Sequence, residues 1–224
     1  MKSLRNHKGV TLVEILVSAS MATITAGALI GVLSQVAQKS SSGNQTTTLA
    51  NELKPALDLI SDEAQGAAKL YTPANLTAIS VTGGSNVQPI LGFWVPNLTT
   101  AVETDYYFRL FYLADAPDSV NYKGPKVLYY SQDSTLTTVA ATNPPTPPTN
   151  PPASVVGGNV VADYLITQPN PLAATSQVNN FVVDGTNKAG VVYLSASTLN
   201  MSGTQSTNSN DRSLTLQTRI NARN

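Results

Sequence analysis

Few residues in this chain are of the types that carry catalysis. Its 224 residues include no cysteine and one histidine, His7. Thiolate nucleophiles, cysteine zinc sites and disulfides are excluded, and one histidine near the start disfavours a Ser-His-Asp arrangement. Asp58 and Asp62 could pair for glycosidic cleavage, but their spacing makes them neighbours on a polar helix face. We expect no enzyme, no catalytic residue and no cofactor.

Carboxylates that could hold a metal ion are the next chemical possibility. Asp115 and Asp118, or Asp184 with its loop, could donate oxygens to Ca²⁺, but no EF-hand-like spacing is present. Aspartates in loops commonly cap turns instead. We therefore favour turn capping for these aspartates and predict no metal site, and the sequence leaves open whether the head binds Ca²⁺.

The distribution of charge disfavours a nucleic-acid partner. The chain has 13 basic and 13 acidic side chains, and three of the basic ones, Lys2, Arg5 and Lys8, fall within the first nine residues. The remainder is mildly acidic and has no Lys/Arg cluster, the feature that supplies most affinity for phosphates. We expect no binding of nucleic acid.

The first forty residues have the pattern of a membrane anchor. Residues 1–9 are short and basic, and the 24 residues 10–33 contain one ionisable side chain, Glu14. A helix of that length spans about 36 Å, enough to cross a hydrocarbon core. The basic residues before it place its N-terminus in the cytoplasm and the remainder outside, by the positive-inside rule.

Glu14 requires an explanation because it lies in an apolar segment. A carboxylate in a membrane helix costs on the order of a few kcal/mol unless it is paired, so such a residue is a functional hypothesis. The alternative is that Glu14, one turn from the helix start, reaches the headgroup region and interacts with the helix dipole.

An ordinary secretory signal peptide is a competing interpretation of this segment. Ala26, Gly27 and Ala28 could form its small-residue cleavage site. However, the apolar run is longer than such peptides have, it contains a carboxylate near its start, and it continues into helix-compatible sequence. Retention of the helix is therefore favoured.

The run KGVTLVE, residues 8–14, resembles the leader junction of type IV prepilins and type II secretion pseudopilins. The resemblance implies that a prepilin peptidase cuts between Gly9 and Val10 and methylates the new amine of Val10. It also implies that Glu14 neutralises the N-terminal amine of a neighbouring subunit during assembly. Glycine suits a cleavage site because it permits close backbone approach. Val10 departs from the usual Phe.

The apolar helix also contains small residues that permit close packing. Gly27 and Gly31 have GxxxG spacing, and Ala19 and Thr23 extend the same face. This pattern suits helix association, and the two glycines equally suit local unwinding.

The chain after the anchor has a second helical pattern. We assign 1–9 to a leader, 10–39 to the transmembrane and assembly helix, 40–72 to its amphipathic continuation, and 73–224 to a β-rich exported head. Pro55 is expected to kink the continuation or mark a restart. The alternative is a separate core helix after a linker.

Strand patterns dominate the head. Residues 105–113 alternate aromatic and aliphatic side chains on both faces, which predicts a central strand. Further strands are predicted at 90–95, 127–131, 178–184, 190–196 and 213–220. The predicted fold class is α+β and pilin-like, with the long N-terminal helix packed on an antiparallel sheet.

A proline-rich segment, residues 143–152, interrupts the strand pattern. Its prolines cannot donate ladder hydrogen bonds, so we predict an exposed extended loop of polyproline type. A spacer is the favoured interpretation and a ligand for a groove the alternative.

The head has a second, weaker resemblance, to J-type minor pseudopilins and W-type minor pilins. It rests on the runs LDLISDEA (57–64), LYYS (128–131) and VADY (161–164) and on the short ending RINARN. It implies a minor structural subunit of a pilus or secretion filament, involved in assembly or initiation. The implied partners are the prepilin peptidase, other subunits and the inner-membrane assembly platform. The alternative is a filament-borne adhesin that contacts surfaces or glycans through tyrosines, Trp94 and polar loops.

Overall fold

The computed structural model describes residues 11–97, 105–118, 121–122, 126–139, 146–165, 181–183, 189–197 and 213–222. Contacts divide the chain into two compact units, Met1–Asn44 and Gln45–Asn224. The boundary falls inside the long helix α1, Leu12–Gln65. Each unit is described by itself.

In the first unit, α1 is an exposed apolar helix. Its residues from 12 to 41, including the large apolar side chains of the segment, are all exposed. The hydroxyls of Ser20, Thr23 and Thr25 donate to the backbone carbonyls four residues earlier, at 2.6, 2.8 and 2.8 Å. The helix is therefore apolar on its surface, and these hydroxyls are satisfied within it.

In the second unit, α1 is amphipathic and packs against the sheet. Its buried side chains recur at three- and four-residue spacing: Leu49, Leu53, Ala56, Leu57, Ile60 and Ala64. The helix continues through Pro55, so the expected restart there is wrong. Pro55 and Asn51, whose carbonyl loses its helical donor, are both exposed, so water can satisfy that carbonyl.

The helix ends earlier than the predicted continuation to residue 72. After Gln65 and Gly66 the chain forms strand β1, Lys69–Tyr71. Leu70 and Tyr71 are buried, and β1 pairs with β3, Gln88–Pro96. Tertiary pairing with a neighbouring strand therefore overrides the helical periodicity here.

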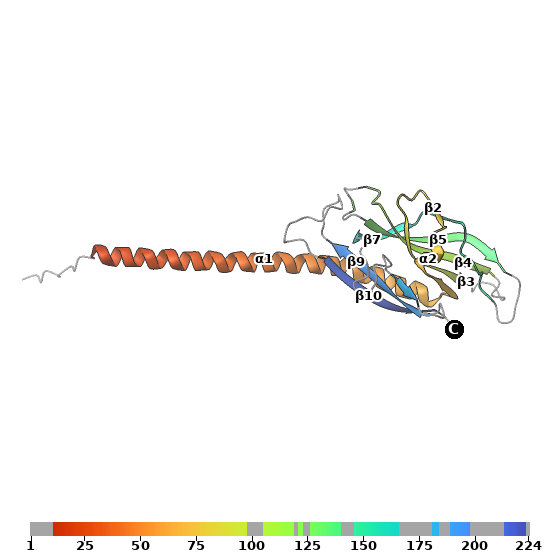
Figure 1. Ribbon diagram of the computed structural model, residues 1–224, viewed down its shortest axis with the longest axis horizontal. Helices are drawn as coiled ribbons and strands as arrows, with labels where there is room; N and C mark the ends of the chain where they lie inside the picture. Colours follow the sequence, from red (N-terminus) through yellow and green to blue (C-terminus); the bar gives the residue numbers. More distant parts are fainter. Residues whose placement is uncertain are drawn as a thin grey trace, which may run out of the picture. The chain divides into compact units, whose positions relative to one another are not determined.

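The head is built on one curled antiparallel sheet with the order β1-β3-β4-β5-β7-β9-β10, with β8 paired to β9 (Figure 1). Its remaining strands are β4 Asp105–Ala114, β5 Lys126–Thr138, β7 Asn159–Leu165, β8 Phe181–Val183, β9 Ala189–Ser197 and β10 Ser213–Asn221. The short helix α2, Pro73–Leu76, follows β1, and β2 Ser80–Thr82 pairs in parallel with β6 Ser154–Val156. The predicted α+β, pilin-like arrangement is confirmed.

Strand β4 is central and buried on both sides, as its sequence predicts. Phe111 and Leu113 belong to the core shared with α1, and Arg109 forms an ion pair with Glu63 of that helix. On the opposite face, Phe108 and Leu110 belong to a second core with α2 and β6. Two dry faces explain the continuous run of large side chains along this strand.

Candidate functional site at the start of the long helix

The described start of α1 holds one predicted site residue, Glu14, together with Thr11, which the prediction missed. Gly9 and Val10, the expected cleavage and methylation positions, lie outside the described residues. Thr11 is the first residue described, and α1 begins immediately after it. The site geometry therefore concerns Thr11 and Glu14.

Thr11 and Glu14 form a reciprocal capping box. The Thr11 backbone N–H and hydroxyl both donate to Glu14 Oε2, at 2.9 and 3.1 Å. The Glu14 N–H donates in return to Thr11 Oγ1 at 3.3 Å. The T-x-x-E spacing is the signal for this motif, and it was present in the sequence.

The capping box fixes where the Glu14 charge lies. It holds the carboxylate at the N-terminal end of the helix, where the helix dipole is positive and an anion is stabilised. The geometry within a single subunit thus supports the alternative in which Glu14 interacts with the helix dipole. Its role toward a neighbouring amine stays a prediction.

The apolar surface that follows is long enough to cross a membrane. Among the described residues, α1 is one helix of sufficient length and apolar character near the N-terminus. Leu12, Ile24 and Ile30 are 75, 72 and 67% exposed. A β-carbon added at Gly27 or Gly31 would meet nothing within 4 Å, so the small-residue face is open. This surface is compatible with single-pass anchoring.

The carboxylates considered for chemistry in the head have ordinary surroundings. Asp58 and Asp62 are exposed on α1. Asp118 accepts bonds from the backbone and side-chain nitrogens of Asn121, at 2.7 and 3.1 Å, as a turn cap does. Asp184 lies outside the described residues. No group of three or more His, Cys, Asp or Glu side chains that could hold a metal occurs in the described part of the chain.

A hollow of about 240 Å³ lies between two glycine pairs, Gly83–Gly84 and Gly157–Gly158. Asp115 lines it and is bonded to Lys126 Nζ at 2.6 Å and to the Asn86 amide. Lys126, and then Asn86, hold the pKa of Asp115 below its usual range, so the carboxylate is ionised and paired at neutral pH. Tyr112 and Tyr129 stack on each other with ring centroids 5.1 Å apart. The polar groups of this hollow are engaged with one another, so it does not favour a glycan site.

Trp94, named as a contact of the alternative adhesin, is not a surface residue. Its side chain is 2% exposed and packs edge-on against Phe108 with centroids 4.9 Å apart. The adhesin alternative took Trp94 to be available at the surface, and the structure shows that it is buried. Trp94 belongs to the buried cluster that includes α2 and β6, and its Nε1–H donates to Asn150 O of the proline-rich segment at 3.3 Å.

Comparison with protein-family models, curated proteins and solved structures found no match for this chain.

Proposed function

We propose that this protein is a minor pilin or pseudopilin, a structural subunit of a type IV pilus or type II secretion-like filament. The observation that carries the proposal is the helix start. A capped glutamate, five residues after Gly9, opens an exposed apolar helix whose later part is the core helix of an antiparallel head. An anchor and a folded head on one helix are what such a subunit needs.

In the proposed pathway, the chain first resides in the cytoplasmic membrane with Lys2, Arg5 and Lys8 on the cytoplasmic side. Prepilin peptidase cuts after Gly9 and methylates Val10. The subunit then leaves the membrane with the help of the assembly platform and enters a filament, where Glu14 meets a neighbour's amine. The exposed apolar surface of α1 contacts lipid before assembly and the helices of other subunits in the filament.

Processing is tested by Gly9→Leu, because a side chain at the cut position obstructs the close approach that the peptidase requires. Intact-mass spectrometry of the protein from its native host should find residues 10–224 with one added methyl group for the wild type. The Gly9→Leu chain should keep its leader. A wild-type protein that begins near residue 29, or a variant trimmed normally, contradicts the proposal.

The role of Glu14 is tested by two variants that separate capping from charge. Glu14→Gln keeps an oxygen that can accept from Thr11 but removes the charge, whereas Glu14→Ala removes both. Pairing with an amine requires the charge, so both variants should be processed yet be depleted from sheared filaments by tenfold or more. Incorporation of Glu14→Gln at the wild-type level would show that the glutamate acts only as a cap.

A further inference from the structure

The described part of the proline-rich segment, residues 146–152, lies against the β1–β3 edge of the sheet. We call these residues the strap. Three successive carbonyl oxygens of the strap accept hydrogen bonds from side chains of these strands: Pro148 O from the Tyr71 hydroxyl at 2.7 Å, Thr149 O from Lys69 Nζ at 3.0 Å, and Asn150 O from Trp94 Nε1 at 3.3 Å. The segment is therefore bound by the head, and the expectation of a spacer is wrong.

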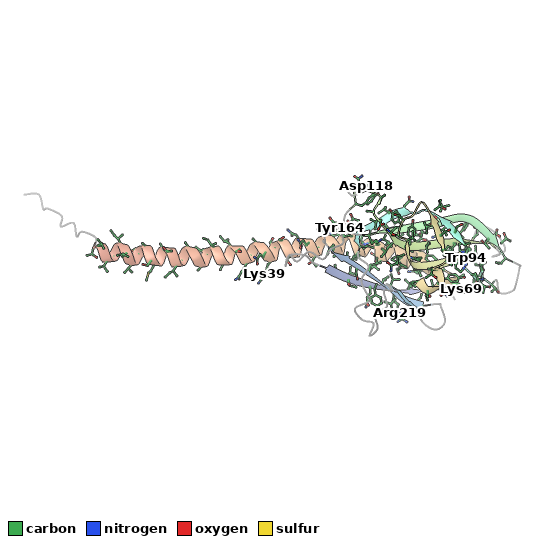
Figure 2. All side chains as sticks on the ribbon, turned by 45° about the horizontal axis from the view of Figure 1, so that its top comes forward. Lys39, Lys69, Trp94, Asp118, Tyr164 and Arg219 are labelled. Atoms are coloured by element: carbon green, nitrogen blue, oxygen red, sulfur yellow. The ribbon has the colours of Figure 1, made fainter. Side chains whose placement is uncertain are left out.

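The three donors form one surface, which we call the donor groove: Lys69, Tyr71 and Trp94. Lys69 and Trp94 are directly opposite each other in the β1–β3 pairing (Figure 2), and Tyr71 lies two residues along the same face. The Lys69 ammonium lies 5.1 Å from the Tyr71 ring centroid, and Trp94 packs on Phe108. The sheet and its core thus position the donors.

The donor groove binds the strap at backbone carbonyl oxygens. Any proline-rich segment offers such carbonyls. Pro147, Pro148, Pro151 and Pro152 are half-buried, while the Thr149 and Asn150 side chains are exposed. Prolines lack an N–H and have a fixed φ, so their segments present carbonyls that aromatic and donor-rich grooves can bind. Burial raises the pKa of Tyr71 to about 12, so its hydroxyl keeps the proton that it donates.

We propose that the donor groove is a recognition site for proline-rich segments, filled by the strap in this chain and open to a proline-rich segment of another polypeptide in its place. The bonds from the groove go to backbone carbonyls, so a segment with the same Pro-Pro-x-x-Pro-Pro spacing offers equivalent acceptors. This inference concerns the head and does not depend on the filament proposal.

The strap is a tethered competitor for such a partner. Its end is anchored because Ala153 O accepts from the Ser80 N–H at 3.0 Å, and β6 then pairs with β2. A tethered segment acts at an effective concentration in the millimolar range. A free segment is therefore expected to bind the wild type weakly, and to bind a chain with a disabled strap much more tightly.

Trp94, the only tryptophan of the chain, reports on the groove directly. The test uses the full-length chain in detergent, with the four strap prolines replaced by glycine. The Trp94 emission of this variant should shift to longer wavelength, and the peptide TPPTNPPA should reverse the shift. A peptide with alanine in place of each proline should not reverse the shift. An unshifted emission in the folded variant, or equal rescue by both peptides, overturns the proposal.

A matched pair of tyrosine variants locates the binding. In the glycine-strap chain, Tyr71→Phe removes one hydrogen bond and should weaken peptide binding about fivefold. Tyr193→Phe, on β9, should leave it unchanged. Equal effects of the two changes would place the peptide elsewhere and overturn the assignment.

A second measurement needs no altered strap and decides the question if the glycine variant does not fold. In the ¹⁵N-labelled wild-type chain, the single indole N–H resonance reports on the Trp94–Asn150 bond. Excess TPPTNPPA at several millimolar should move this resonance by competing with the strap, and the alanine peptide should not. An indole resonance unmoved by the proline peptide overturns the proposal.

Discussion

At the start of α1, a single carboxylate serves the local structure and, in the proposed filament, a neighbour. Both bonds that Glu14 accepts from Thr11 go to Oε2. The capping box therefore places the charge at the helix end before any partner arrives. An amine that approaches a fixed carboxylate loses less conformational freedom than one that approaches a mobile side chain.

Replacement of Thr11 by Val should loosen the first turn of α1. Valine lacks the hydroxyl that accepts from the Glu14 N–H, and loss of such a cap costs about 1 kcal/mol. Hydrogen exchange of the first-turn amides in micelles should accelerate about fivefold. Thr11→Ser keeps the hydroxyl and should exchange like the wild type. Equal exchange in the two variants would argue that the cap is unimportant.

Glu52 should make the head less stable as the pH rises. Burial, and then the Asp163 carboxylate, raise the pKa of Glu52 above its ordinary value of 4.5. Between 4.5 and that raised pKa, the folded chain retains a proton that the unfolded chain has released, so stability falls as the pH rises. Above the raised pKa the whole penalty is present.

Glu52→Gln removes this penalty because glutamine has no ionised form. The variant should unfold at a higher temperature than the wild type at pH 7, and the difference should shrink toward pH 4. The measurement is thermal unfolding followed by Trp94 fluorescence. Asp58→Asn, which removes an exposed carboxylate from the same helix, controls for net charge. A difference that grows toward low pH would reverse the assigned sign.

Sequence reasoning at the residue level depended on local patterns. Glu14 was singled out by its charge in an apolar run, although its bonds to Thr11 were missed. The predicted exposure of Trp94 was wrong, because residues of β4, α2 and β6, from other segments of the chain, bury it in one core. Side-chain patterns within one strand do not report such contacts.

At the scale of elements, Gly158, in the connection between β6 and β7, shows how closely that connection approaches β5. A β-carbon added there would lie 2.2 Å from the backbone oxygen of Tyr130 in β5, so Gly158→Ala must push the connection away from the strand. The expected loss of stability is about 2–3 kcal/mol, as for other overpacked sites. Thermal unfolding monitored by Trp94 fluorescence measures it.

Gly43→Ala is the matched control for this change. It makes the same substitution within α1, where the added carbon meets nothing within 4 Å. Alanine favours a helix over glycine by up to about 1 kcal/mol, so this variant should not lower stability. If both alanines destabilised the protein equally, the close approach at Gly158 would not explain the loss.

Element prediction depended only partly on length. Strands β3, β4, β9 and β10 were predicted within a few residues. The long helix was predicted but ends before residue 72, β5 extends beyond the predicted 127–131, and β7 was not predicted although it has seven residues. Strands β1, β2 and β6 have three residues each, too few for any period, and they were missed. Their strand character comes from pairing with distant partners, such as β2 with β6.

At the scale of the whole molecule, the two units treat their apolar side chains differently. The part of α1 in the first unit exposes apolar side chains, while the second unit buries its apolar side chains in two cores. An exposed apolar helix of this length is costly in water, because each large side chain buried instead gains roughly 1.5–3 kcal/mol. The segment is therefore compatible with a membrane anchor.

The absence of cysteine makes the proposed orientation directly testable. Single cysteines are introduced at Ser3, before the anchor, and at Gln217, which is exposed on β10. In spheroplasts of a host without prepilin peptidase, the leader stays attached and a membrane-impermeant maleimide reaches only the outer side. The reagent should label Gln217→Cys in intact spheroplasts, and Ser3→Cys only after lysis, because the basic leader holds the N-terminus in the cytoplasm. Labelling of Ser3→Cys before lysis, with Gln217→Cys protected, would invert the orientation and place the Gly9–Val10 bond on the wrong side for its peptidase.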